Sequence, residues 1–188
     1  MGEPFSNVLT KHPYLRVTDF HDQSVDLTNL KFISDEIHQQ IARYTISSAD
    51  VYISIAGTIG LLGTVPEELD GANLTENAAK LVFDTGAIDK RFLSIVGNGE
   101  PVQSQIRSLT HAAGVPKLAL ERIKTLRFPL PPLATQQAIV AEIEAEQALV
   151  AANRELIARF EKKIQATLAR VWGADQGTES PTLPLGGT

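Results

Sequence analysis

The sequence has no cysteine among its 188 residues, and it has no long apolar run. Without cysteine, disulfide bonds and thiolate metal sites are excluded. No stretch of about 18 apolar residues is present, so no segment is expected to span a membrane. The first residues lack the basic and apolar regions of a secretion signal, and we expect a cytoplasmic protein. Hydrophobic residues make up 43% of the chain, which is enough for a sizeable core.

Positive charge is also scarce, because 17 Lys and Arg residues face 22 Asp and Glu residues, a net charge of −5. This balance argues against a protein that coats nucleic acid without selectivity, for which a basic domain is expected. It still allows a domain that gathers a few basic residues on one face. Residues 1–135 hold 12 basic and 15 acidic side chains, so we expect the chain alone to attract phosphates only weakly.

The motifs of common enzymes are missing as well. There is no dinucleotide-binding glycine pattern, no phosphate-binding loop and no Gly-x-Ser-x-Gly nucleophile turn. The four histidines are scattered, and the grouping of His21 with Asp19 and Asp22 is more typical of a solvated loop than of a metal site. We therefore expect a non-catalytic chain without a metal or cofactor of its own; an enzyme with an unrecognised site is a minor alternative.

Three unlike parts follow one another along the chain. The first part, residues 1–133, alternates short strand-like runs with Gly, Asn and Asp as far as residue 128. It ends in Pro-Leu-Pro-Pro-Leu at 129–133, which forms a stiff extended boundary. Residues 134–172 contain no Gly or Pro and predict one long helix, and residues 173–188 predict a flexible tail. The fold class is therefore α+β: a mixed, β-rich domain followed by a long C-terminal coiled-coil helix.

Within the first part, alternation and β-branched residues predict strands. A glycine-containing turn at 57–60 predicts a hairpin between two of them, and residues 117–123 fit a strand or a turn of helix equally well. The strands are expected at 14–18, 51–55, 61–65 and 79–83, and short helices at 35–43 and 90–95.

The long helix carries apolar residues at every seventh position, which we call the apolar row: Ile143, Val150, Ile157, Ile164 and Val171. Asn153 and Phe160 belong to a second, interrupted row, and this pattern is typical of a coiled coil. At about 1.5 Å per residue the helix would be roughly 55 Å long, so it cannot bury the row on a 130-residue domain alone. A partner helix is therefore expected, with packing back onto the chain's own domain as the alternative.

Charge along the helix favours an antiparallel partner. The first half carries Glu142, Glu144 and Glu146, whereas the second half carries Arg159, Lys162, Lys163 and Arg170 against Glu161 alone. Two antiparallel copies would set acidic halves beside basic halves. Exposed ion pairs contribute only about 0.2–1 kcal/mol each, so they favour an orientation more than they add stability. We expect a homodimer in which Asn153 fixes the register.

What remains is a set of hydrogen-bonding side chains at strand ends and in expected loops. Arg, Asn and Gln can recognise base edges, and Lys, Ser and Thr suit phosphates. An alternative for Asn73, Thr75 and Asn77 is that they satisfy backbone groups of a turn. The candidate DNA-binding residues, the last four lying in or after an expected loop, are Arg16, Thr18, Thr58, Asn73, Thr75, Asn77, Gln103, Gln105, Arg107 and Lys117.

The order of several segments resembles the DNA-specificity subunit of type I restriction–modification systems. The resemblance covers about residues 13–171, and the proline stretch joined to Gln-Gln-x-Ile-Val and a long helix is its most specific part. The segments are Pro13-Tyr-Leu-Arg-Val-Thr-Asp19, Asp50-Val-Tyr-Ile-Ser-Ile-Ala-Gly-Thr-Ile-Gly60, Leu74-Thr-Glu-Asn-Ala78, Gly114-Val-Pro-Lys-Leu118 and Phe128-Pro-Leu-Pro-Pro-Leu-Ala-Thr-Gln-Gln-Ala-Ile-Val140.

The resemblance implies a target recognition domain that recognises one half of a bipartite site in double-stranded DNA, followed by a helix that pairs antiparallel. It also implies partners: methyltransferase subunits, which dock on the helices and bind S-adenosylmethionine, and a motor-nuclease subunit that cleaves DNA. The specificity subunit itself has no catalytic activity and no cofactor.

This chain departs from the family's usual pattern in two respects. It has one recognition domain and one helix instead of two of each, so we expect a half-subunit that pairs with a second copy and recognises a symmetric, interrupted site. Few residues precede the first strand, so the recognition domain is expected to be incomplete there. The alternative function is a regulatory protein that sequesters methyltransferase subunits without recognising DNA. Alanine substitution of Gln103, Gln105 and Arg107 should alter the methylated sequence only under the first hypothesis.

Overall fold

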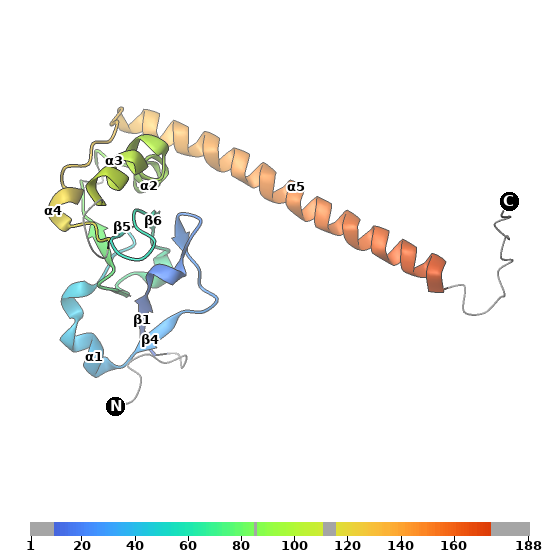
Figure 1. Cartoon of the computed structure of the whole chain (residues 1–188), viewed down its shortest axis with the longest axis horizontal. Helices are drawn as coiled ribbons and strands as arrows, with labels where there is room; N and C mark the ends of the chain where they lie inside the picture. Colours follow the sequence, from blue (N-terminus) through green and yellow to red (C-terminus); the bar gives the residue numbers. More distant parts are fainter. Residues whose placement is uncertain (1–9, 85, 111–115, 174–188) are drawn as a thin grey trace, which may run out of the picture. The chain divides into compact units, whose positions relative to one another are not determined.

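The structure is a computed structural model that describes residues 10–84, 86–110 and 116–173 (Figure 1). The chain divides into two compact units, the first ending at Val140 and the second beginning at Ala141. Within the described residues, no helix has both the length and the apolar character needed to cross a membrane. The elements are β1 His12–Leu15, η1 Val17–Asp19, β2 Phe20–His21, β3 Ser24–Val25, β4 Lys31–Ile33, α1 Asp35–Gln40, η2 Ala42–Tyr44, β5 Val51–Ser54, β6 Leu62–Thr64, η3 Glu67–Leu69, β7 Asn73–Leu74, β8 Ala78–Leu81, α2 Lys90–Gly97, α3 Glu100–Thr110, α4 Leu120–Ile123 and α5 Leu133–Gly173.

The strands of the first unit form three small sheets. β6, β5 and β8 make one antiparallel sheet, and the expected hairpin across residues 57–60 is confirmed by the β5–β6 pairing. In a second sheet β1 lies between β4 and β7, antiparallel to β4 and parallel to β7. β2 and β3 form a separate hairpin. The expectation of a β-rich mixed domain followed by a long helix is confirmed.

Two hydrophobic clusters lie around these sheets. One gathers Leu15, Ile46, Tyr52 and Leu74, and the other places Val102 and Ile106 of α3 against Ile53 of β5. Figure 1 shows α2 and α3 beside the sheet that contains β5 and β6. Every buried polar side-chain atom among the described residues has a hydrogen-bond partner, as expected of a well-formed interior.

The segment around residues 100–110 differs from its expected loop conformation, because it forms helix α3. Val102 and Ile106 are four residues apart and both are buried, so one face of the segment packs into the core. Pro101 is tolerated because it lies in the first turn, where its missing N–H has no helical partner in any case. The polar residues between them made the segment look like a loop in the sequence. The loop expectation for Gln103, Gln105 and Arg107 was therefore wrong.

Smaller differences concern strand ends. The strand expected at 14–18 ends at Leu15, because the Asp19 carboxylate accepts from the Arg16 backbone N–H and turns the chain into η1. The segment 117–123, whose sequence fitted a strand or a turn of helix equally well, contains the four-residue helix α4. The expected helices at 35–43 and 90–95 are confirmed as α1 and α2, each with an N-cap side chain: Ser34 and Asp89.

Gly63 of β6 lies where no side chain fits. A Cβ at this position would come within 2.1 Å of the Tyr52 hydroxyl and 2.7 Å of the Gln23 backbone carbon. Tyr52 is 1% exposed and its hydroxyl donates to the Ser24 carbonyl at 2.6 Å, so it cannot move without losing that bond. Burial raises the pKa of Tyr52, as expected for a phenol removed from water.

Replacing Gly63 with alanine should therefore destabilise the first unit by about 1–3 kcal/mol through overpacking. Urea denaturation of the purified chain, followed by far-UV circular dichroism, measures the change. Gly173→Ala is the matched control, because a Cβ there meets nothing within 4 Å. An unchanged midpoint for Gly63→Ala would contradict the packing described for Tyr52.

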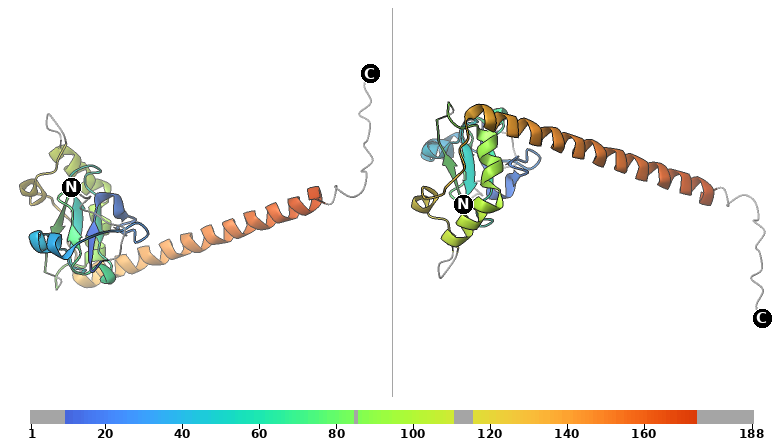
Figure 2. Two further views of the ribbon diagram at one scale, coloured as in Figure 1. Left: turned by 90° about the horizontal axis from the view of Figure 1, so that it is seen from below. Right: turned by 90° about the horizontal axis from the view of Figure 1, so that it is seen from above.

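The predicted long helix is confirmed as α5, which is continuous from Leu133 to Gly173 in both further views (Figure 2). Its first turns belong to the first unit, where Gln136 and Val140 are buried. The remainder, from Ala141 onward, forms the second unit. The tail expected at 173–188 lies outside the described residues beyond Gly173.

Candidate functional site

Arg16 and Thr18, two of the candidate contact residues, lie at and after the end of β1. The Arg16 Nε and Nη2 groups donate to the Asp19 carboxylate at 3.0 and 2.5 Å, and Nη2 also donates to the Asn29 carbonyl. Asp19 is 4% exposed. These bonds to Asp19 raise the pKa of Arg16 and commit most of its donors within the fold. Thr18 is exposed on η1.

Asn73, another candidate, is fully buried in β7. Its Nδ2 donates to the Ile41 carbonyl at 3.2 Å, so its Oδ1 accepts from His38 Nδ1 at 2.7 Å. The His38 ring stacks on His12 with a centroid distance of 3.8 Å. Both ends of the Asn73 amide therefore hold η2, α1 and β7 together, which matches the structural alternative considered for it.

The candidates on α3 also hold backbone groups. Gln103 Nε2 donates to the carbonyls of Gly60 and Gly97, both at 2.8 Å. Gln105 bonds both the N–H and the carbonyl of Arg127. Arg107 forms an ion pair with Glu100. Alanine substitution of these residues would perturb the packing of α3, so it no longer separates the two functional hypotheses.

Thr58, Asn77 and Thr75 lie at two loops of the β6–β5–β8 sheet. Thr58 is exposed in the hairpin turn, and its carbonyl accepts from Ser54. Asn77 is exposed, and its carbonyl accepts from the N–H groups of Ile55 and Ala56. Thr75 is 6% exposed and its hydroxyl accepts from the Asn77 N–H. The exposed side chains of Thr58 and Asn77 remain open to a ligand.

The structure brings Thr75 and Lys117 together at a cavity of about 460 Å³. Its floor is apolar and includes Ile55, Leu74 and Leu118, which are all buried. Its rim carries three cations and one carboxylate. We call this feature the cationic groove and define it by Arg43, Tyr44, Thr75, Lys80, Lys117 and Leu120.

Glu76 supplies the single carboxylate of the groove, and the Tyr14 hydroxyl donates to it at 3.3 Å. Burial raises the pKa of Tyr14, and the nearby Glu76 charge raises it further. Among the described residues, no group of three or more His, Asp or Glu side chains could hold a metal ion. The arrangement suits hydrogen bonding and charge pairing with an anionic ligand.

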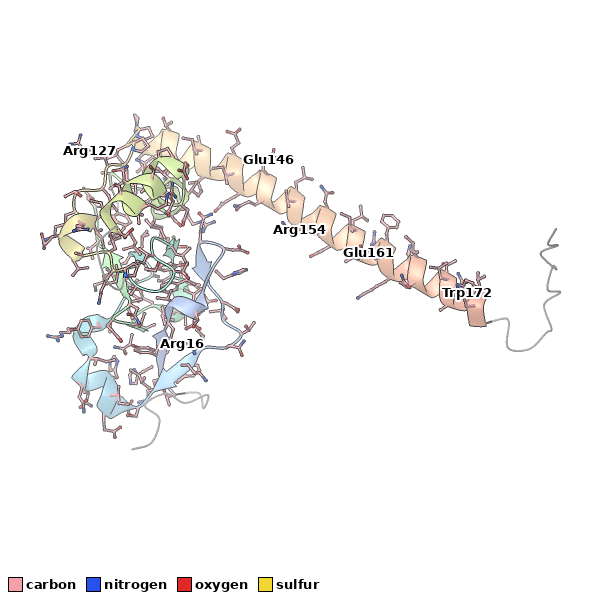
Figure 3. The ribbon with its side chains drawn as sticks, viewed as in Figure 1. Arg16, Arg127, Glu146, Arg154, Glu161 and Trp172 are labelled. Carbon is pink, nitrogen blue, oxygen red and sulfur yellow. The ribbon has the colours of Figure 1, made fainter. Side chains whose placement is uncertain are left out.

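The sequence reasoning missed Arg43, Tyr44 and Lys80. One signal could have found the region: residues 116–127 hold four cations and one carboxylate in a chain of net charge −5. Figure 3 marks Arg127 at the end of this segment. No sequence signal places Arg43 and Lys80 beside it, since that depends on how η2 and β8 meet.

The second unit exposes the apolar row of α5. Val150, Ile157, Ile164 and Val171 are each between 48% and 65% exposed, and Phe160 is 52% exposed. Asn153 is exposed as well, whereas Ile143 is half-buried. Figure 3 places Glu146, Arg154, Glu161 and Trp172 along this helix. Large apolar side chains in a row on an exposed helix mark a surface for association.

Comparison with known proteins identifies relatives of this chain. A family model described as the type I restriction modification DNA specificity domain matches residues 6–162. The type I restriction enzyme EcoBI specificity subunit of Escherichia coli is 30% identical over 157 residues, covering 84% of this chain and 31% of that protein.

Solved structures agree at the level of the fold. The HsdS subunit from Thermoanaerobacter tengcongensis matches with a TM-score of 0.68 and 19% identity, over 93% of this chain and 45% of that one. A chain from a study of complex assembly and conformational transition of the type I R-M system matches with a TM-score of 0.63 and 18% identity, over 93% and 45%. The chain thus spans less than half the length of these relatives. The family model covers well over half of the sequence, and this chain belongs to the type I restriction–modification DNA specificity domain family.

Proposed function

We propose that the chain recognises one half of a bipartite site in double-stranded DNA and takes no part in catalysis. The observation that carries this proposal is the family match, which extends over both the first unit and most of α5. The candidate contacts that the fold leaves open to DNA are exposed side chains: Thr18, Thr58, Asn77 and Lys117.

The proposed function also implies partner subunits. Methyltransferase subunits dock on α5 and bind S-adenosylmethionine, and a motor-nuclease subunit joins the complete complex. One structural relative comes from a type I R-M system whose complex assembly has been described. The exposed apolar row of α5 supports a helical partner, either a second copy of the chain or another specificity half-subunit. A second copy would give a symmetric, interrupted DNA site, because the spacing of half-sites follows the symmetry of the protein.

A selection from random DNA duplexes tests sequence recognition although the target sequence is unknown. The purified chain is mixed with a duplex pool at about 50 mM salt, where phosphate contacts are strong, and bound DNA is recovered, amplified and sequenced over several rounds. We expect enrichment of one short motif, or of two copies at fixed spacing if the chain dimerises. Bound DNA without any enriched motif would contradict sequence recognition.

The second candidate function is regulation, in which the chain sequesters methyltransferase subunits through α5 and recognises no DNA. The exposure of Ile157, Phe160 and Ile164 favours it as much as it favours dimerisation. The same selection separates the two functions, because a sequestering protein enriches no motif.

A further inference from the structure

The cationic groove lies on the first unit, where η2, the β7–β8 connection and the segment before α4 meet. Of its lining residues, Thr75 and Lys117 were candidates from sequence, whereas Arg43, Tyr44 and Lys80 have no assigned role. Its volume of about 460 Å³ lies within the range of about 300–1,000 Å³ that is common for ligand sites. The groove is therefore large enough to hold part of a polyatomic ligand and not only a single ion.

The rim of the groove carries net positive charge, whereas the chain as a whole is negatively charged. Arg43, Lys80 and Lys117 face Glu76 alone, although the whole chain has a net charge of −5. Within the described residues, none of the three cations forms an ion pair. Lys80 Nζ is held by the Thr45 carbonyl at 2.8 Å. An acidic protein that concentrates uncompensated cations at one cavity favours an anionic ligand there.

Tyr44 adds an aromatic surface to these cations. Its side chain is 46% exposed, and the Arg43 guanidinium carbon lies 4.6 Å from the ring centroid. Arg43 lies over one side of the ring, and the remaining exposed area of Tyr44 is available to a ligand. Aromatic rings beside cations are the usual means by which proteins bind single-stranded nucleic acid. On a duplex, whose base faces are stacked on one another, such a ring can pack against a backbone sugar while the cations pair with phosphates.

We propose, on the basis of the proposed function, that the cationic groove binds one strand of the DNA duplex. Arg43 and Lys117 contact phosphates, Lys80 adds charge at the rim, and Tyr44 with the apolar floor receives a backbone sugar. Glu76 opposes this binding and weakens it. The groove is thus a backbone-contacting surface, separate from the loops around Thr58 that remain candidates for base recognition.

The first experiment compares two double variants with the same loss of charge. Arg43→Gln/Lys117→Gln alters the groove, and Arg159→Gln/Lys162→Gln removes two exposed cations from α5. Binding to a fluorescent random-sequence 24-base-pair duplex is measured by anisotropy at several salt concentrations. Each lost phosphate contact should lower the log–log salt slope by about 0.9. The groove variant should therefore lose roughly 1.8 in slope and bind roughly 10- to 100-fold more weakly at about 50 mM salt.

Substitutions at two further positions, Tyr44 and Glu76, separate the effect of charge from that of the aromatic ring and from misfolding. Tyr44→Ala should weaken binding about fivefold with an unchanged salt slope, because the neutral apolar area that covers a sugar is lost, whereas Tyr44→Phe should bind like the wild type. Glu76→Gln should bind more tightly than the wild type, since it removes the opposing charge but keeps an acceptor for Tyr14. A gain in affinity cannot come from misfolding.

Each alternative result has a distinct meaning. If the groove and helix variants lose affinity equally, overall charge governs binding and the groove proposal fails. If neither variant changes binding while the random-duplex selection still enriches a motif, DNA recognition stands, the groove proposal fails, and the groove is left to a protein partner. If the wild-type chain binds no duplex even at about 50 mM salt, the groove proposal and the proposed function fail together.

Discussion

Replacing Gln136 with leucine is expected to destabilise the first unit by about 2–4 kcal/mol, because three backbone groups lose a hydrogen-bond partner at once. Gln136 is fully buried in the first turn of α5. Its Nε2 donates to the carbonyls of Ala87 and Pro131, at 2.9 and 2.8 Å. Its Oε1 accepts from the Asp89 N–H at 2.9 Å. Leucine has a similar size but none of these polar atoms.

The loss of stability in Gln136→Leu should exceed that of an ordinary core substitution in this chain. The reason is that Asp89, whose N–H loses its partner, also caps α2 by accepting from the Phe92 N–H. Urea denaturation gives the free energy of unfolding, and the thermal midpoint should fall by roughly 5–15 °C. Gln137→Leu is the matched control: it makes the same change one residue later, at an exposed position. Equal stability of the two variants would show that the amide bonds of Gln136 contribute nothing.

A glutamate at the same position tests the hydrogen bonds rather than the packing. Gln136→Glu keeps the side-chain shape but sets a carboxylate oxygen against the two carbonyls that the amide served. Burial and these carbonyls should raise the carboxyl pKa in the folded state above the ordinary value of about 4.3. Stability is then lost as pH rises from the unfolded-state pKa toward the folded-state pKa, and the deficit shrinks as pH falls toward about 4. A pH-independent deficit would contradict the assigned bonds.

Gln136 also shows what sequence can and cannot predict in this protein. The Gln-Gln after the proline stretch was recognisable as part of a family pattern, but its physical role depends on Ala87 and Asp89, which lie almost 50 residues earlier. Long-range contacts of this kind leave no local pattern. The long helix was predictable because its apolar period and its lack of Gly and Pro are local properties.

The candidate site also contains some features that the sequence could predict and others that it could not. Hydrogen-bonding residue types were found from sequence, but Asn73 and Gln103 use those groups inside the fold. A polar residue looks the same in sequence whether it faces DNA or a backbone carbonyl, so only burial separates the two uses. The cationic groove, by contrast, combines residues from several segments, and only the cluster around Lys117 was visible as a local excess of charge.

Replacing Ile157 with aspartate is expected to abolish self-association of the chain. Ile157 lies in the middle of the apolar row and is 58% exposed, beside Phe160 at 52% and Ile164 at 56%. If two copies pair through this row, an aspartate buries a charge at the centre of the interface, which costs several kcal/mol unless it is paired. Light scattering should give a mass near twice 20.4 kDa for the wild type and near 20.4 kDa for the variant.

Ala148→Asp is the matched control for that substitution, because position 148 lies on the side of α5 away from the apolar row and is exposed. It adds the same charge to the same helix and should leave the dimer intact. A monomeric wild-type chain would reassign the row to a methyltransferase subunit or another partner. In contrast, a variant that remains dimeric would place the interface elsewhere on the chain. A dimer that only Ile157→Asp dissociates would give two recognition units from one short chain, and hence a symmetric DNA site.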